Sequence, residues 1–411
     1  MSNNRREGWL IAMLCASATA GYIARVNVST AGPLLMNEFG ISQVAMGKIF
    51  SAFLLGYALF QIPAGAMADR WGARRILTIA AWLWVIFTIL QVFAGWGPLK
   101  SSAAAALTGF MVIRFLLGIS ASPTYPASAQ GVSKWIMPLH QGRANGIIIS
   151  SIGLGSAIAP VLVSNVMIHW GWRAALLISA VPALIISFIW LKIREPLPVN
   201  HYPLQNEYIR EETSDNHNKN LKSTSFILLT ASYTLQGYVG YIFVTWFYLY
   251  LVQERHFSLL TGAWMSSLPW ILSIVSIPLG GYISDRLISG RAGFVWGRRI
   301  VPIIGMVFSG VLISIGAHTG NGILAAISLA FATALILCVE GPFWATMIRI
   351  SGNRSGTAGG IMNMGSNIGG LISPVLTPLI ASFIGWENAL HVAALLAVIA
   401  GILWFRIKPE A

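Results

Sequence analysis

Three charged side chains interrupt long apolar stretches of the sequence: Arg25, Arg114 and Glu340. If these stretches cross a bilayer, a charge without a partner costs about 2.5 kcal/mol or more, so each charge needs a partner. Two guanidinium groups are matched by one carboxyl group, and a bound anion would supply the missing negative charge. The alternative is that an arginine pairs with Glu340 or with backbone carbonyl groups as a structural strut. The residue types therefore favour an anion-binding site.

Polar residues at helical spacing accompany these charges. Tyr22 lies three residues before Arg25, and a stripe with small residues leads from Arg114 to Tyr125. Many such side chains simply pack inside helical bundles, but together they outline one polar region. The candidate ligand-binding residues are Arg25, Arg114, Tyr22, Tyr57, Gln61, Tyr125, Gln236, Tyr241, Trp344, Asn363 and Asn367. The set includes two pairs spaced four residues apart, so the members of each pair share a helix face.

The elements that position these residues must cross a membrane. The 411 residues are 56% hydrophobic and 9% charged, whereas soluble domains carry about 25% charged residues. So few charges cannot cover a soluble surface of this size, and the expected surrounding is a lipid bilayer. The net charge of +13 therefore indicates no nucleic-acid partner. Twelve apolar segments are long enough to be spans, near residues 9–36, 43–68, 73–96, 103–133, 138–168, 172–193, 224–252, 259–284, 300–318, 322–349, 356–384 and 388–406.

The twelve segments fall into two sets of six. A polar stretch from Glu195 to Ser223, containing EETSDNHNKN, separates them and has the composition of a flexible linker. We expect an all-α integral membrane protein of 12 transmembrane helices, with an N-terminal half at 1–194, a cytoplasmic linker at 195–223 and a C-terminal half at 224–411.

Basic residues predict the orientation. With the N-terminus inside, twenty arginines and lysines fall in cytoplasmic segments and four on the opposite side. This bias obeys the positive-inside rule and places both termini in the cytoplasm. We expect no cleavable signal peptide, because the first apolar stretch is too long and lacks a small-residue cleavage site. The expected location is the cell inner (plasma) membrane, which the chain crosses many times.

An internal repeat relates the two halves. Three sets of residues recur in order at nearly constant offsets of 216, 216 and 214: Gly21-Tyr22 as Gly237-Tyr238; Gly65, Asp69 and Arg70 as Gly281, Asp285 and Arg286; and Gly142, Gly146 and Pro160 as Gly356, Gly360 and Pro374. Both Asp-Arg pairs lie on the same side of the membrane, so each half holds an even number of spans. The halves therefore repeat in parallel, an arrangement suited to two bundles that rock around a central site.

The segment GAMADRWGARR (65–75) connects the second and third spans. Gly65 permits two helices to approach closely, and Asp69 can bond neighbouring helix ends and basic residues in one conformation only. A basic turn that merely obeys the positive-inside rule is the alternative, but a second copy, GGYISDR, favours a gating role. The predicted gating residues are Gly65, Asp69, Arg70, Arg74, Arg75, Asp285 and Arg286. The segment resembles the Gly-x-x-x-Asp-Arg-x-Gly-x-Arg-Arg loop of the major facilitator superfamily.

Longer stretches resemble the anion:cation symporter branch of that superfamily. They are SAFLLGYALFQIPAGAMADRWGARR (51–75), YLVQERHFSLL (250–260) and EGPFWATMIRISGNRSGTAGGIMNMGSNIGGLISP (340–374). Members of the branch include sugar-acid, sialic-acid and vesicular glutamate transporters. The resemblance implies secondary transport of a small organic anion, for example a carboxylate such as a sugar acid. It also places Arg25 where the branch uses a first-span arginine to hold a substrate carboxylate.

One departure from the branch concerns the coupling ion. Proton-coupled members carry an acid immediately before the first-span arginine and a glutamate seven residues after the fourth-span arginine, whereas this chain has Ala24 and Ala121 there. Glu340 is the remaining deep carboxyl and hence the expected proton carrier. Uncoupled uniport or anion exchange is an alternative, and so is sodium coupling through groups such as Asn363 and Asn367. A transporter-like receptor is a remote alternative.

Enzymatic chemistry finds no support in the sequence. His, Cys, Asp and Glu form no cluster with metal-ligand spacing, and the Gly-x-x-x-x-Gly-Lys-Ser/Thr phosphate loop is absent. We therefore expect no catalytic residues, no metal and no cofactor, and a protein that works as a monomer.

Overall fold

The computed structural model describes residues 3–94, 102–136, 138–193, 221–290, 293–351 and 355–408, and these residues form helices and turns without a strand. Backbone groups in lipid find no water to bond, so long apolar segments satisfy them within helices. The predicted all-α fold is confirmed. Most of the predicted linker, residues 195–220, lies outside the described residues.

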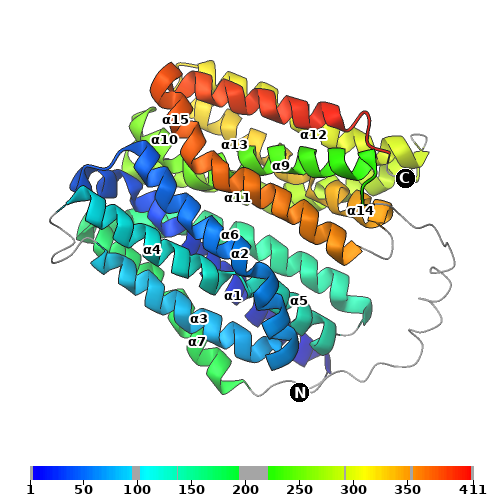
Figure 1. Cartoon of the computed structure of the whole chain (residues 1–411), viewed down its shortest axis with the longest axis horizontal. Coiled ribbons are helices and arrows are strands. Elements are labelled where there is room, and N and C mark those ends of the chain that lie inside the picture. Colours follow the sequence, from blue (N-terminus) through cyan, green and yellow to red (C-terminus); the bar gives the residue numbers. More distant parts are fainter. Residues whose placement is uncertain are drawn as a thin grey trace.

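Figure 1 shows the helices in two groups, those before residue 193 in the lower part of the view and those after residue 221 in the upper part. The N-terminal half contains α1 (Asn3–Phe39), α2 (Gln43–Trp71), α3 (Ala73–Leu90), the short 3-10 helix η1 (Gln91–Phe93), α4 (Ala103–Ala121), α5 (Thr124–Trp135), α6 (Pro138–Ser179) and α7 (Val181–Lys192). The C-terminal half contains α9 (Thr224–Thr245), α10 (Phe247–Gln253), α11 (Leu259–Ile288), α12 (Gly293–His318), α13 (Gly322–Cys338), α14 (Glu340–Ser351) and α15 (Ser355–Leu403).

Ten helical stretches of the described residues are long and apolar enough to cross a membrane. Two of them, Gly146–Lys192 and Ala358–Leu403, have 47 and 46 residues, about twice the length that one crossing needs. A glycine with positive φ breaks each of them, Gly171 at 75° and Gly385 at 83°. Residues with a Cβ rarely adopt this conformation. The two breaks raise the count to the twelve predicted spans, and the two glycines are again 214 residues apart.

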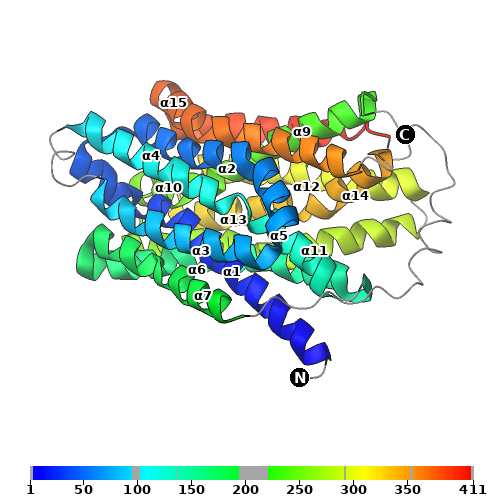
Figure 2. The ribbon, with the colours of Figure 1, turned by 60° about the horizontal axis from the view of Figure 1, so that its bottom comes forward.

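Both termini lie toward the same end of the bundle in Figure 1 and Figure 2. We call this end the terminus side, and the opposite end, where α1 stops at Phe39 and α2 begins at Gln43, the far side. The even number of spans in each half explains why both halves begin and end on the terminus side.

The two halves are joined mainly on the far side. Gly47 of α2 packs directly against the carbonyl of Pro374 in α15, where no larger residue would fit. Nearby, Ser51 Oγ donates a hydrogen bond of 2.7 Å to the carbonyl of Leu371. A second seam joins α6 to α11, where Ser267 Oγ donates to the carbonyl of Ala157 at 2.6 Å. Among the described residues, most inter-half hydrogen bonds thus lie in the middle of the bundle or on the far side, and the bond between Asn363 and Gln61 lies nearer to the terminus side.

Candidate functional site

Arg25 lies in the middle of α1 and points between the two halves. Its Nη2 donates to Tyr241 Oη at 2.7 Å, and its Nη1 donates to Tyr22 Oη at 3.2 Å. The guanidinium carbon lies 5.1–5.5 Å from the ring centroids of Tyr22, Phe53, Tyr57 and Tyr241. No carboxylate of the described residues pairs with it. Aromatic faces and hydroxyls can hold a cation, but they leave its positive charge available to an anion.

The Arg25–Tyr241 hydrogen bond joins two positions that are 216 residues apart. This separation equals the repeat offset, so the two residues occupy equivalent places in the two halves. Equivalent residues meet only close to the axis that relates the halves. The site therefore lies at the centre of the molecule, with a cation from one half and a phenol from the other.

Arg114 of α4 lies beside Arg25, but its hydrogen bonds go to backbone carbonyl groups of α1. Its Nη2 donates to the carbonyl of Arg25 at 3.0 Å, and its Nη1 lies 3.4 Å from the carbonyl of Ala24. The guanidinium carbon lies 4.8 Å from the ring centroid of Phe53. The side chain is only 3% exposed. Of the arrangements that the sequence left open, the structure shows the bond to backbone carbonyls.

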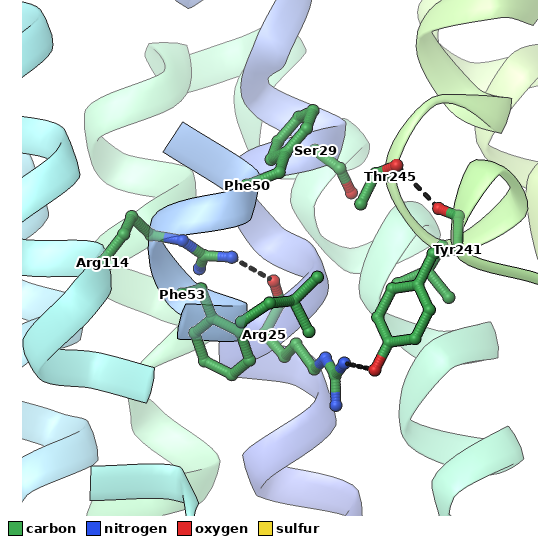
Figure 3. A pocket seen from close by; sticks show the side chains of 9 residues that line it. Arg25, Ser29, Phe50, Phe53, Arg114, Tyr241 and Thr245 are labelled. Carbon is green, nitrogen blue, oxygen red and sulfur yellow. Dashed lines mark hydrogen bonds between the residues drawn. The ribbon is translucent and has the colours of Figure 1, made fainter. Parts of the chain in front are cut away.

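A small cavity adjoins these arginines on the far side (Figure 3). It has a volume of about 10 Å³, which is about the room that a single water molecule needs. Its lining consists of Arg25, Ser29, Phe50, Phe53, Leu54, Arg114, Tyr241, Val244 and Thr245. An organic anion does not fit there, so packing closes the far side of Arg25 in this conformation.

Glu340 begins α14, directly after the break that ends α13. Its Oε2 accepts a hydrogen bond from Tyr233 Oη at 2.9 Å, and its Oε1 accepts one from Gln236 Nε2 at 2.9 Å. Trp344 stands edge-on to Tyr233, with the ring centroids 6.5 Å apart. The carboxyl therefore has neutral partners, and it pairs with no arginine of the residues that the structure describes.

A chain of three polar side chains crosses between the halves nearer to the terminus side. Asn363 Nδ2 donates to Gln61 Oε1 at 3.2 Å, and Gln61 Nε2 donates to Tyr57 Oη at 3.4 Å. Asn367 lies one turn further along α15 and is buried. Tyr125 lies beside Tyr22 of the arginine site. The predicted ligand-binding residues other than Asn367 thus lie in the central region or border it.

The predicted gating residues lie near the end of α2, at the start of α3 and, in the second copy, near the end of α11. Arg74 donates to the carbonyl of Leu191 at 3.1 Å, and Gly65 lies close to Pro126. Arg70 and Arg75 are exposed. The Asp69 side chain lies outside the described residues.

The second copy of this turn has its own contacts. Asp285 forms an ion pair of 2.7 Å with Arg298, the first arginine of the Arg298-Arg299 pair that follows the motif. Arg286 donates to Tyr282 Oη at 2.7 Å. Both contacts stay inside the C-terminal half, and the ion pair between Asp285 and Arg298 joins α11 to α12.

Sequence reasoning missed several residues of the central region. Tyr233 lies three residues before Gln236, and this helical spacing would have been a signal for it. Phe53 carries no polar group, yet its ring is shared by Arg25 and Arg114. Nothing in the sequence distinguishes it from other phenylalanines, because its role depends on two helices meeting.

Comparison with known proteins identifies one family and several transporters that this chain resembles. The model of the Major Facilitator Superfamily matches residues 13–370. The "Probable sulfoacetate transporter SauU" of Cupriavidus necator is 28% identical over 377 residues, which are 89% of this chain and 85% of that protein. The hexuronate transporter of Bacillus subtilis is 27% identical over 415 residues, 97% of this chain and 94% of its own length. The "Probable galactarate/D-glucarate transporter GudP" of Escherichia coli is 29% identical over 443 residues, 98% and 95% of the two chains.

Solved structures share the same fold. A bacterial homologue of the human lysosomal transporter Spinster, in an inward-facing and occupied conformation, has a TM-score of 0.78 at 18% identity and covers 98% of this chain and 97% of its own. The inward open xylose transporter XylE of Escherichia coli has a TM-score of 0.76 at 15% identity, with 97% and 96% covered.

Proposed function

The chain belongs to the Major Facilitator Superfamily, and we propose that it carries a small organic anion across the membrane by alternating access. As a member of this superfamily it is a transporter and not an enzyme. The expected substrate is a carboxylate or sulfonate of the size that the sugar-acid and sulfoacetate transporters among its relatives are named for. Arg25 would bind the acid group.

The central position of Arg25, which pairs with no carboxylate in the described part of the chain, carries this proposal. A guanidinium fork matches the two oxygens of a carboxylate or sulfonate. In the conformation seen here, Tyr241 Oη occupies one donor of that fork at 2.7 Å. An arriving anion would replace this hydroxyl. Substrate binding would then break one of the bonds that join the two halves, which links binding to the rocking motion.

We further propose that the terminus side faces the cytoplasm. The excess of arginine and lysine in the segments on this side supports the orientation. The halves, residues 1–194 and 224–411, would rock as units about the central site, and the segment 195–223 would connect them on the cytoplasmic side. The far side, packed together here, would face outward, in the plasma membrane, with each monomer working alone.

Proton coupling through Glu340 is the proposed source of driving force. Glu340 lies at a helix break beside the central region and bonds neutral groups, so its proton can leave without breaking an ion pair. Ala24 and Ala121, which stand where proton-coupled relatives carry acids, leave this carboxyl as the candidate carrier. Uniport or exchange without a coupling ion, and sodium coupling through Asn363 and Asn367, remain the competing proposals.

Uptake into liposomes tests these proposals together. Purified protein is reconstituted into liposomes and offered labelled hexuronate, hexarate or sulfoacetate. Each substrate is offered with a proton gradient directed inward (outside more acidic), with a sodium gradient directed inward, or with neither. We expect accumulation driven by the pH gradient alone, and loss of accumulation with retained exchange in Glu340→Gln. Accumulation that ignores the pH gradient would exclude the proton route. Counterflow of labelled substrate separates a transporter from a receptor, since a receptor shows none.

A further inference from the structure

The C-terminal half holds a second polar group in the central region, formed by Glu340, Tyr233 and Gln236; we call it the carboxyl cluster. We propose that the carboxyl cluster binds the end of the substrate opposite to its acid group, and that it selects anions bearing a hydrogen-bond donor, a hydroxyl or an ammonium, at that end. This inference rests on the proposed function, because it names the class of anion that the same site accepts.

The carboxyl cluster has acceptor capacity to spare. Tyr233 and Gln236 are 5% and 4% exposed, whereas Glu340 is only partly buried. Each carboxyl oxygen accepts one hydrogen bond from them, at 2.9 Å in both cases. The side chain of Trp344 is a third neutral hydrogen-bond partner of the carboxyl. A carboxylate has about four acceptor positions, so a ligand can still donate to it. These neutral donors hold the carboxyl in place without cancelling its charge.

Tyr241 connects the carboxyl cluster with Arg25. Its hydroxyl accepts the hydrogen bond from Arg25, and its phenol group lies near enough to interact electrostatically with both Arg25 and Glu340. The central region therefore carries a cation on one side and a carboxyl on the other, which do not bond each other. Trp344, 37% exposed beside the carboxyl cluster, offers an apolar face for a carbon chain.

A ligand with an acid group at one end and a donor at the other satisfies both groups at once. A simple alkyl anion would leave the carboxyl without a ligand donor. An anion with a second negative group at its far end would be repelled by a charged Glu340. The arrangement thus favours hydroxy acids, amino acids whose ammonium group lies at the end opposite to the acid group, and the sulfonate counterparts of both. It disfavours alkyl monoanions and dianions without a hydroxyl or ammonium group.

Two matched series of sulfonates test this inference at fixed pH without any ion gradient. One series contains ethanesulfonate, 2-hydroxyethanesulfonate, 2-aminoethanesulfonate and sulfoacetate. The other series contains the four corresponding compounds with one more carbon atom between the sulfonate and the far end. Kd is measured on purified protein by thermal stabilisation. In at least one series we expect the hydroxyl or the amino compound to bind about tenfold more tightly than the alkyl parent, because hydrogen bonds to charged groups are strong. The two arms show which donor the carboxyl prefers.

Variants assign the preference to the carboxyl cluster. Glu340→Gln should reduce the advantage of the preferred compound, hydroxyl or amino, to less than about threefold, while the alkyl parent binds almost as before. Glu387→Gln, which alters an exposed carboxyl on α15, should leave the whole pattern unchanged. If Glu340→Gln does not fold, Tyr233→Phe removes one hydrogen bond to the carboxyl and should lower the same ratio.

The outcomes separate this inference from the proposed function. Equal binding of all members in both series, tightest binding of the dianions, or a preference that survives Glu340→Gln would overturn the role of the carboxyl cluster while leaving anion transport intact. Failure of every sulfonate and carboxylate to bind folded protein would overturn both.

Discussion

The two halves of the molecule share one fold but carry different chemistry at equivalent positions. Arg25 in the N-terminal half corresponds to Tyr241 in the C-terminal half, and the two side chains bond each other at 2.7 Å. The repeat preserves glycines and prolines, which decide how helices pack, while the charged groups of the central region have diverged. Such asymmetry gives a central site two unlike sides, which a symmetric pair of halves could not offer.

The far side shows the same divergence in a pair of tryptophans. Trp172 and Trp386 each follow the glycine that breaks a long helix. Trp172 Nε1 donates to Glu38 inside its own half at 2.6 Å, whereas Trp386 Nε1 donates across the halves to Gln43 at 3.1 Å. One copy of the motif therefore joins α6 to α1 within the N-terminal half, and the other copy joins the two halves.

The largest expected effect concerns the cation of the N-terminal half. Arg25→Ala removes the proposed anion ligand, and Arg25→Lys keeps the charge but loses the fork. Loss of one partner of a buried charge pair costs about 2–5 kcal/mol, so we expect Kd for the anion to rise about 30-fold or more. Binding to purified protein checks this, with Arg173→Lys on the far side as control. Wild-type affinity in Arg25→Ala would contradict the proposal that the N-terminal half supplies the cation that binds the anion.

Arg114 should respond differently from Arg25, although both are arginines of the N-terminal half. Arg114→Ala leaves the carbonyls of Ala24 and Arg25 without their side-chain donor and opens a gap beside Phe53. We expect a loss of stability of about 2–3 kcal/mol, seen as a lower thermal midpoint and a lower yield. Binding should weaken only because Arg25 is less well positioned. An unchanged midpoint with lost binding would instead make Arg114 a direct anion ligand.

Substitution of Trp172 and Trp386 distinguishes the effect of a contact within one half from that of a contact between the halves. Trp386→Phe removes the hydrogen bond to Gln43, so the conformation closed on the far side should lose about 1 kcal/mol, roughly a fivefold shift in population. Trp172→Phe should lower stability without shifting that population. Spin labels at Lys48→Cys and Phe383→Cys, in a background with Cys15 and Cys338 replaced by serine, report the distance across the far side. An equal shift in both variants would contradict the distinction.

The smallest effect is expected at the second copy of the gating turn. The Asp285 side chain is 67% exposed in its ion pair with Arg298, and exposed pairs contribute about 0.2–1 kcal/mol. Asp285→Asn should therefore change the exchange rate only slightly. Asp69→Asn alters the complete copy of the motif and should slow exchange more than it weakens binding. Exchange in liposomes and Kd in detergent measure the two effects; equal rates in both variants would argue against a special role for the first copy.

Much of the architecture could be predicted because lipid imposes simple rules on a chain. Apolar segments of sufficient length predicted the twelve spans, the offsets of 216 and 214 predicted two parallel halves, and the family match agrees with the motif at 65–75. A buried charge in an apolar helix is rare enough to indicate a functional position, so Arg25 could be placed near the centre from sequence alone.

The partners of these charges were decided only by the tertiary structure. Arg114 meets the carbonyl of Arg25, 89 residues away, and Glu340 meets Tyr233, 107 residues away. Helical periodicity predicts which side chains share a face, but it does not give the rotation or the depth of one helix against another. In a membrane, faces toward lipid and faces toward other helices are equally apolar. Which polar groups meet is therefore determined by packing, through contacts such as Gly47 against Pro374, that no single segment of the sequence contains.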